Sequence, residues 1–360
     1  MKAAVLKAFG SNLVVEDIAE PQLGTGEIIV DVAASGVLPY ASEVFSGERK
    51  YLLDLPAVPG PSAIGRVHAV GPDATHLKPG DWVYCDPTVR SRDNPQAPDI
   101  TLLGWSARGD GGIKLQQHFR NGCWAERVRV PTENAVPIGP IEARKAASWC
   151  AIGVWLVPYG GWVATNLQPG ESALVSGATG NFGSAAIAVA LAMGASWVVA
   201  PGRNEAMLAE LARRFGKRVI PVRLTGNEAA DRQLMLAAAP GPIDCVMDIL
   251  PPQVATKAVR AALMTVRQNG RVVLMGGVGM LGGAGLDLPY PWIMRSCITI
   301  HGAWMYPREA IPRMVGLVRS GLLDLSQFAV KEFPLERVNE AIAHAAAHGG
   351  PFTKTVLKPG

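Results

Sequence analysis

The sequence contains no apolar run long enough to cross a bilayer. The longest one, residues 185–200, is interrupted by Gly194, where a helix should end before a strand begins. The N-terminal residues MKAAVLK also lack the sustained apolar stretch of a secretory signal. The formal net charge is only +4 and the basic residues are scattered, which disfavours a nucleic-acid groove or an anionic membrane surface. We therefore expect a cytoplasmic protein that binds neither membranes nor nucleic acids.

Cysteine is scarce as well. The chain has five cysteines, at positions 85, 123, 150, 245 and 297, and none of them forms a CxxC pair. An odd number without close spacing argues against a disulfide framework. We expect all five to be buried thiols in a reducing compartment.

The 360 residues are enough for two domains, and 49% hydrophobic with 18% charged residues is ordinary for a globular protein. Roughly the first 135 residues alternate like strands between Pro and Gly turns. Within them, the tract 85–122 is polar, rich in glycine and weakly patterned, which suggests an extended excursion from a small barrel.

From residue 142 onward, helical runs alternate with short apolar segments, the pattern of a doubly wound α/β sheet. The six predicted parallel strands are residues 173–176, 197–200, 218–222, 245–249, 271–275 and 298–302. A helix over 311–320, a strand over 328–333, a second helix from 335 and a strand over 353–357 follow. Because six strands already complete a cofactor sheet, we expect these last elements to return to the first domain.

A glycine-spaced turn follows the first of these strands. It reads Gly177-Ala-Thr-Gly-Asn-Phe-Gly183, between an apolar strand and an alanine-rich helix. Glycines at this spacing allow a sharp turn, close approach of the backbone to a diphosphate, and close packing of helix on strand. We expect the cofactor to contact Gly177, Thr179, Gly180, Asn181, Phe182 and Gly183.

The end of the second predicted strand indicates which dinucleotide binds. An NAD(H) site places a carboxylate there for the ribose 2′-hydroxyl. This chain instead reads Gly202-Arg203-Asn204, three residues that we expect to contact the cofactor, and the Arg203 guanidinium suits a 2′-phosphate. We therefore predict NADP(H) rather than NAD(H); the alternative is that Arg203 is a solvated loop residue.

After the fifth strand, backbone groups of Gly276 and Gly277 are expected to hold the nicotinamide, or to form only a flexible loop.

The chain resembles the medium-chain dehydrogenase/reductase superfamily over nearly its whole length. The matching pieces are Met1-Lys-Ala-Ala-Val5, Gly26-Glu-Ile-Ile-Val30, residues 36–47, Pro59-Gly60, Val70-Gly71, Lys78-Pro-Gly-Asp-Trp-Val83, the glycine turn and Phe333-Pro-Leu-Glu-Arg-Val338. The resemblance implies a GroES-like β-barrel domain at 1–150, a Rossmann domain at 151–306 and a segment, 307–360, that completes the barrel domain. It also implies a small-molecule substrate bound between the domains, and a homodimer or homotetramer.

The zinc-dependent branch of that family places metal ligands where this chain has Leu38, Pro61-Ser62 and Val154. Two of these residues are apolar, one is proline, and serine is not a usual zinc ligand. The resemblance is therefore to the zinc-free branch, the quinone oxidoreductase-like and enone reductase-like members, and we expect no metal. Those relatives carry an Asn at the position of Leu38 and an acidic residue near Ala41, and both are absent here.

Without a metal, the negative charge left by hydride transfer to a carbonyl carbon needs a proton donor. Tyr40 stands where zinc-dependent relatives place a relay hydroxyl and is the first candidate; Ser42 and Tyr51 are weaker ones. An activated double bond or a quinone spreads the charge and needs less assistance, so we rank such substrates above simple ketones. The alternatives are a metal-free ketone or aldehyde reductase and a non-catalytic NADPH-binding sensor.

The expected substrate pocket is apolar and aromatic, with candidates Trp105, Trp149, Trp155, Tyr290 and Trp292.

Overall fold

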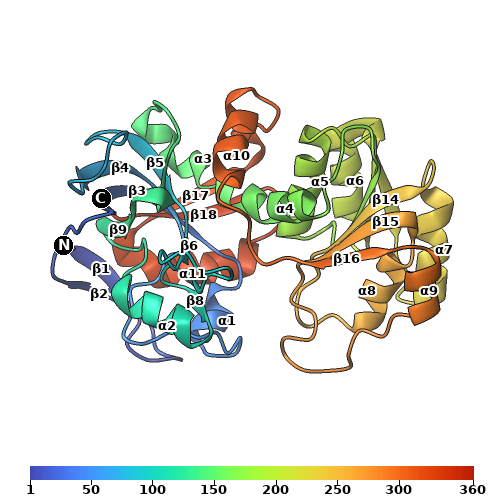
Figure 1. Ribbon diagram of the computed structural model, residues 1–360, viewed down its shortest axis with the longest axis horizontal. Helices are drawn as coiled ribbons and strands as arrows, with labels where there is room; N and C mark the ends of the chain where they lie inside the picture. The colour runs from blue at the N-terminus through green and yellow to red at the C-terminus, as the bar shows by residue number, and fades with distance from the viewer. The chain divides into compact units, whose positions relative to one another are not determined.

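The computed structural model describes residues 1–360 and divides the chain into two compact units (Figure 1). The first unit comprises residues 1–153 and 325–360, and the second comprises residues 154–324. No helix is both long and apolar enough to span a membrane. Four of the five cysteines are buried, whereas Cys297 is exposed, so the prediction that all five are buried was wrong for that residue.

The first unit is built on a seven-stranded sheet that includes the end of the chain. Its order is β10-β5-β4-β3-β18-β17, with β9 also paired to β3. The C-terminal strand β18 runs antiparallel to β3, with Val356 opposite Gly36. Apolar side chains from β3, β4, β5 and β9 form its core. The strands are β3 (Glu27–Val37), β4 (Ala63–Val70), β5 (Trp82–Cys85), β9 (Arg127–Pro131), β10 (Ala135–Pro137), β17 (Ala329–Pro334) and β18 (Thr353–Lys358).

Short elements complete this unit. The strands β1 (Lys2–Val5) and β2 (Val14–Asp17) pair with each other, and the helix α1 (Ala41–Phe45) follows β3 closely. The helices α3 (Ala146–Trp149) and α11 (Val338–His348) both contact β3 and β17.

The tract 85–122 is more regular than its sequence suggests. It forms the antiparallel sheet β6 (Thr88–Arg90), β7 (Ile100–Leu102) and β8 (Ser106–Arg108), followed by helix α2 (Gly109–His118). Strands of three residues are too short to produce a recognisable alternation, which explains why the sequence pattern failed here. Buried Gln116 ties α2 to the segment between α1 and β4, because its side-chain oxygen accepts a hydrogen bond from the Asp54 N–H at 2.7 Å.

The second unit contains the predicted doubly wound sheet. Its six strands are all parallel, in the order β13-β12-β11-β14-β15-β16, and each of the six predicted strands is present. Residues of β11 are buried throughout, as expected for a strand covered by helices on both faces. The strands are β11 (Ala173–Ser176), β12 (Val198–Gly202), β13 (Val219–Arg223), β14 (Ile243–Asp248), β15 (Val266–Leu274) and β16 (Thr299–Gly302).

Seven helices accompany this sheet. They are α4 (Ile152–Ala164), α5 (Asn181–Ala192), α6 (Glu205–Phe215), α7 (Glu228–Ala238), α8 (Thr256–Leu263), α9 (Tyr290–Arg295) and α10 (Ala310–Arg319). Residues 307–324, which include α10, lie in the second unit, whereas the sequence pattern had grouped them with the segment that returns to the first.

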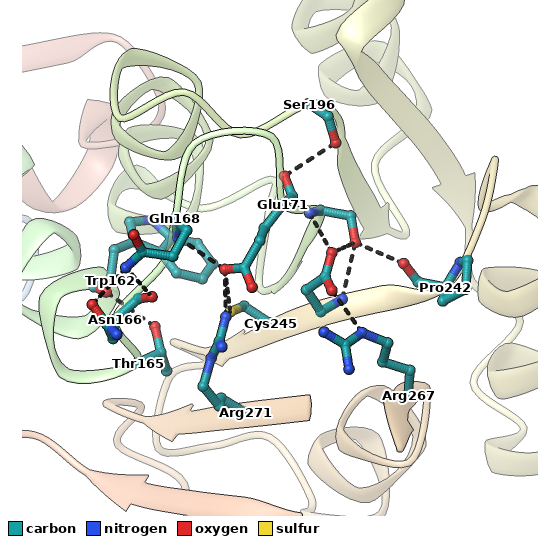
Figure 2. A network of polar contacts seen from close by, with 12 residues as sticks. Trp162, Thr165, Asn166, Gln168, Glu171, Ser196, Pro242, Cys245, Arg267 and Arg271 are labelled. Atoms are coloured by element: carbon teal, nitrogen blue, oxygen red, sulfur yellow. Dashed lines mark hydrogen bonds and ion pairs between the residues drawn. The ribbon is translucent and has the colours of Figure 1, made fainter. Parts of the chain in front are cut away.

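A polar network pins the amino ends of the central strands (Figure 2). Arg271 of β15 pairs with Glu171 and lies 3.1 Å from the Cys245 Sγ. Asp244 accepts a hydrogen bond from Arg267 at 2.6 Å and another from the Ser172 hydroxyl at 2.7 Å. These groups bond to one another at the amino edge of the sheet, although the buried Arg271 Nε has no partner. In a parallel sheet of this kind ligands bind at the carboxyl edge, where the glycine turns lie, so that edge is the candidate place for a ligand.

Candidate functional site

The glycine turn between β11 and α5 is packed so tightly that there is no room for a side chain at its last glycine. Gly177 has a φ of +95°, which favours glycine, and the Gly180 N–H donates to the Gly177 carbonyl at 2.9 Å. A Cβ added at Gly183 would lie 1.9 Å from the Gly177 oxygen. The backbone of the turn therefore packs directly on the first turn of α5.

The N-terminus of α5 offers unpaired donors. The first turn of a helix leaves the N–H groups of Asn181, Phe182 and Gly183 without intrahelical acceptors. No side chain caps this helix, and its first turn carries no acidic residue. The three N–H groups fit a diphosphate, which would accept from them and interact favourably with the helix dipole. The buried Asn181 Oδ1 also has no partner, but it is an acceptor and cannot bind a diphosphate oxygen.

The end of β12 has no room for a side chain. A Cβ at Gly202 would lie 2.4 Å from Cγ2 of Thr179, so a carboxylate at this position would have to displace Thr179. Arg203 is exposed beside it, whereas the Asn204 side chain caps α6 by accepting from the Met207 N–H at 3.0 Å. The side-chain oxygen of Asn204 is therefore already engaged in a hydrogen bond that caps α6.

Arg223 adds a second guanidinium next to Gly202. It ends β13, directly opposite Gly202 in the sheet, and pairs with Glu205 at 2.9 Å. Sequence analysis missed this residue, because only the pairing of β12 with β13 brings it to the end of β12.

The turn after β15 lies against the end of β14. The Gly277 N–H donates to the Leu250 carbonyl at 2.8 Å, and a Cβ on Gly276 would lie 2.5 Å from Oδ2 of Asp248. Gly276 and Gly277 are thus held close to the adjacent strand rather than forming a loose loop. Asp248 is buried, and that burial raises the pKa of its carboxyl to about 7.

In the first unit, the predicted proton donor Tyr40 precedes α1 and lies among aromatic and charged groups. Trp105 packs edge-on against its ring at a centroid distance of 5.9 Å, and the Arg49 guanidinium lies 4.0 Å from the ring centroid. Burial of the phenol, with Tyr51 nearby, raises the pKa of Tyr40 well above its usual range. Tyr40 therefore remains a protonated hydrogen-bond donor at neutral pH, whereas Ser42 is exposed on α1.

The positions where a zinc ion would be held do not fit one. Leu38 and Val154 have no donor atom, and the backbone carbonyl of Ser62 accepts from the Ser35 hydroxyl at 2.7 Å. Burial raises the pKa of the Cys150 thiol to about 12, which disfavours the thiolate that binds zinc. No three side chains of His, Cys, Asp or Glu are grouped so as to hold a metal.

Comparison with known proteins supplies the family. Residues 24–140 match the family profile described as the alcohol dehydrogenase GroES-like domain, and residues 182–320 match the zinc-binding dehydrogenase profile. The chain belongs to the medium-chain dehydrogenase/reductase superfamily. This medium-chain enzyme is an oxidoreductase of the alcohol dehydrogenase-like type, and a nicotinamide cofactor, NAD or NADP, is expected for it.

Individual relatives have different names. The chain is 28% identical over 353 residues to an alcohol dehydrogenase of Moraxella sp. (strain TAE123), covering 94% of each chain. It is 27% identical over 313 residues to the acryloyl-coenzyme A reductase of Metallosphaera sedula, covering 84% of this chain and 85% of that one. The solved alcohol dehydrogenase TADH from Thermus sp. ATN1 superposes with a TM-score of 0.81 at 23% identity and 99% coverage of both chains.

The five predicted pocket aromatics of this medium-chain enzyme are divided between its units. Trp105 and Trp149 are buried in the first unit and Trp155 is buried in the second. Tyr290 of α9 is 74% exposed, and Trp292 packs against the core of the second unit. Each unit on its own holds only part of the set, so a shared aromatic pocket stays a prediction.

A buried lysine of the first unit was missed by sequence analysis. Lys354 on β18 is 7% exposed and is the only lysine or arginine of the chain that is buried. Its Nζ lies 2.6 Å from the place of a Cβ on Gly36, so the absence of a side chain at Gly36 makes room for it. Burial lowers the pKa of this ammonium, which makes it a better proton donor than an exposed lysine. The signal for it is the pairing of β18 with β3, which sequence pattern alone does not reveal.

Proposed function

We propose that this chain is a zinc-independent, NADPH-dependent reductase of an activated carbon–carbon double bond or a quinone. The observation that carries the proposal is the donor set around Leu38. Apolar side chains, a proline and a serine, none of them a usual zinc ligand, stand where the metal would bind, and the nearby hydroxyl is a phenol held in its protonated form. The cofactor, when bound, supplies the hydride.

The choice of substrate class follows from charge. Hydride addition to a simple ketone concentrates negative charge on one oxygen, which is costly without a cation close by. Addition to an enone or quinone spreads that charge, so a single hydrogen bond from the Tyr40 hydroxyl suffices. The relative named acryloyl-coenzyme A reductase supports this class, because its name describes reduction of an activated double bond.

The second candidate function is reduction of a ketone or aldehyde. The relatives named alcohol dehydrogenase favour it, and Lys354 provides a buried ammonium on the strand next to β3. The two functions differ in their products: a saturated ketone or a hydroquinone in the first case, and an alcohol in the second.

The test is NADPH consumption, followed at its near-ultraviolet absorbance, against quinones, enones and simple ketones. Each assay is repeated after prolonged treatment with a zinc chelator. We expect turnover with quinones or enones and no loss after chelation. Turnover restricted to ketones supports the second function, and inactivation by the chelator with recovery on adding zinc refutes metal independence.

The first prediction concerns cofactor choice. Arg203→Ala is expected to weaken NADPH binding about 10-fold to 100-fold and NADH binding less than about 3-fold, because one charge-assisted contact to the 2′-phosphate is lost. Dissociation constants from cofactor fluorescence measure both. Arg218→Ala, which removes an exposed arginine before β13, is the control and should leave both constants unchanged. Equal losses for the two cofactors in Arg203→Ala contradict the NADPH assignment.

The second prediction concerns the proton donor. Tyr40→Phe keeps the ring packed on Trp105 but removes the hydroxyl, so kcat should fall about 10-fold to 100-fold while cofactor affinity is unchanged. Ser42→Ala, on the short helix α1 that follows Tyr40, is expected to retain kcat because Ser42 is exposed. Steady-state kinetics separates the two variants. Unchanged turnover in Tyr40→Phe rejects Tyr40 as donor and makes Lys354 the next residue to test.

A further inference from the structure

One buried carboxyl lies between the two glycine turns of the second unit. Asp248 is the last residue of β14, with Ser176 of β11 opposite it on one side and Leu274 of β15 on the other. The chain after Ser176 makes the glycine turn, and the chain after Leu274 makes the turn at Gly276. Asp248 is only 3% exposed.

The contacts of this carboxyl join both turns. The Ser176 hydroxyl and the Leu250 N–H hydrogen-bond to it, and its Oδ2 lies 2.5 Å from the place of a Cβ on Gly276. The backbone after Asp248 is also close to the first glycine turn, because a Cβ placed on Gly177 would lie 3.2 Å from the carbonyl oxygen of Ile249. Its Oδ1 is buried and has no partner at all.

No charged group faces this carboxyl. The helices α4 and α5 carry no charged residue, and Tyr159 is the only titratable side chain among them. On α8, which packs against β14, Lys257 is exposed and Arg260 pairs with Glu228 at 2.7 Å. Burial is therefore what favours the neutral form, and the hydrogen bonds from Ser176 and Leu250 oppose it.

We propose that the protonated Asp248 carboxyl holds the two glycine turns in the arrangement that binds the nicotinamide cofactor, and that its ionisation weakens binding. A carboxylate between the turns has one buried oxygen without a donor and repels the diphosphate above the α5 N-terminus, so ionisation disfavours the bound state. Asp248 is a positioning residue in this scheme. The inference rests on the cofactor lying at these turns, as proposed above.

The experiment measures dissociation constants for NADH and NADPH by fluorescence between pH 5.5 and 8.5, using the full chain. NADH is included because a phosphate monoester itself titrates near pH 6. Wild-type binding should weaken about 10-fold as the pH rises through 7, a coupling of ordinary size. Asp248→Asn, which cannot ionise, should bind with nearly the same affinity across this range.

Two further variants keep the test decisive. Asp287→Asn removes an exposed carboxyl of the same unit, whose side chain is 88% exposed, and should keep the wild-type pH profile. Ser176→Ala removes a hydrogen bond that favours the charged form, so its midpoint should move to higher pH. This variant serves even if Asp248→Asn fails to fold.

Three results overturn the inference. They are a wild-type affinity that does not change with pH, a pH profile in Asp248→Asn equal to that of the wild type, and an unmoved midpoint in Ser176→Ala. Absence of cofactor binding at every pH overturns the proposed cofactor site as well, which distinguishes that failure from the other three.

Discussion

Replacing Gly183 by alanine is expected to abolish tight cofactor binding. The new Cβ would lie 1.9 Å from the Gly177 oxygen, and both atoms belong to the same tightly packed turn. Relieving the clash moves the turn by more than about 1 Å, and a displacement of that size costs on the order of 100-fold where a bound group must be positioned accurately. Overpacking should also destabilise the second unit by about 3 kcal/mol. Cofactor fluorescence titration and thermal denaturation measure the two effects.

Two other glycines make the experiment specific. Gly316→Ala, at an exposed position of α10 with no atom within 4 Å of the new Cβ, should bind cofactor normally and lose no stability. Gly180→Ala has more room, 3.3 Å from the Gly177 oxygen, and should fold. A weaker affinity in that variant without lower stability would indicate that the diphosphate passes over Gly180. Wild-type affinity in Gly183→Ala would refute the glycine turn as the binding site.

Replacing Asp248 by asparagine is expected to stabilise the second unit at high pH and to have little effect at low pH. The folded-state pKa of Asp248 is raised from 3.8 to about 7, so the folded chain keeps a proton that the unfolded chain has already lost. Stability therefore falls as the pH rises from about 4 to about 7 and is constant above, by at most about 4 kcal/mol. An asparagine side chain does not titrate, so the Asp248→Asn variant does not lose this stability as the pH rises.

The measurement is the difference in Tm between Asp248→Asn and the wild type from pH 5 to pH 8.5. We expect a difference that is smallest at pH 5 and grows by about 5–10 °C between pH 5 and pH 8, given the usual size of Tm shifts for a unit of this length. Asp287→Asn should show no such trend. A difference that is constant with pH would mean that the carboxyl titrates normally in the folded chain. The expected gain also implies that an ionisable residue is kept here at a cost in stability, as positions that serve binding often are.

Much of the second unit was predictable because its signals are local. Its strands β11 and β12 are short segments buried throughout, and β11 was predicted with its correct bounds, residues 173–176. The glycine turn was recognisable because spacing along the chain alone encodes a sharp turn before a helix. In contrast, the antiparallel sheet of β6, β7 and β8 was missed, since strands of three residues carry no periodic pattern.

The prediction for Asn204 illustrates another limit. Asn204 was expected to contact the cofactor, and its side-chain oxygen caps α6. A cofactor contact through the amide NH₂ stays a prediction. A polar residue before a helix is ambiguous in sequence, because capping and ligand binding use the same side chains. Only the hydrogen bond in the folded chain distinguishes these roles.

The order of residues alone was enough to predict the class of fold, the six parallel strands and the place of the glycine turn, since each depends on neighbours within a few positions. The folded chain alone decided that Asp248 lies buried between two turns, that Arg223 stands beside Gly202, and that Lys354 fills the space at Gly36. These groupings join residues tens or hundreds of positions apart. Burial and strand neighbours set the charge state of such groups, and both come into being only when the sheets assemble.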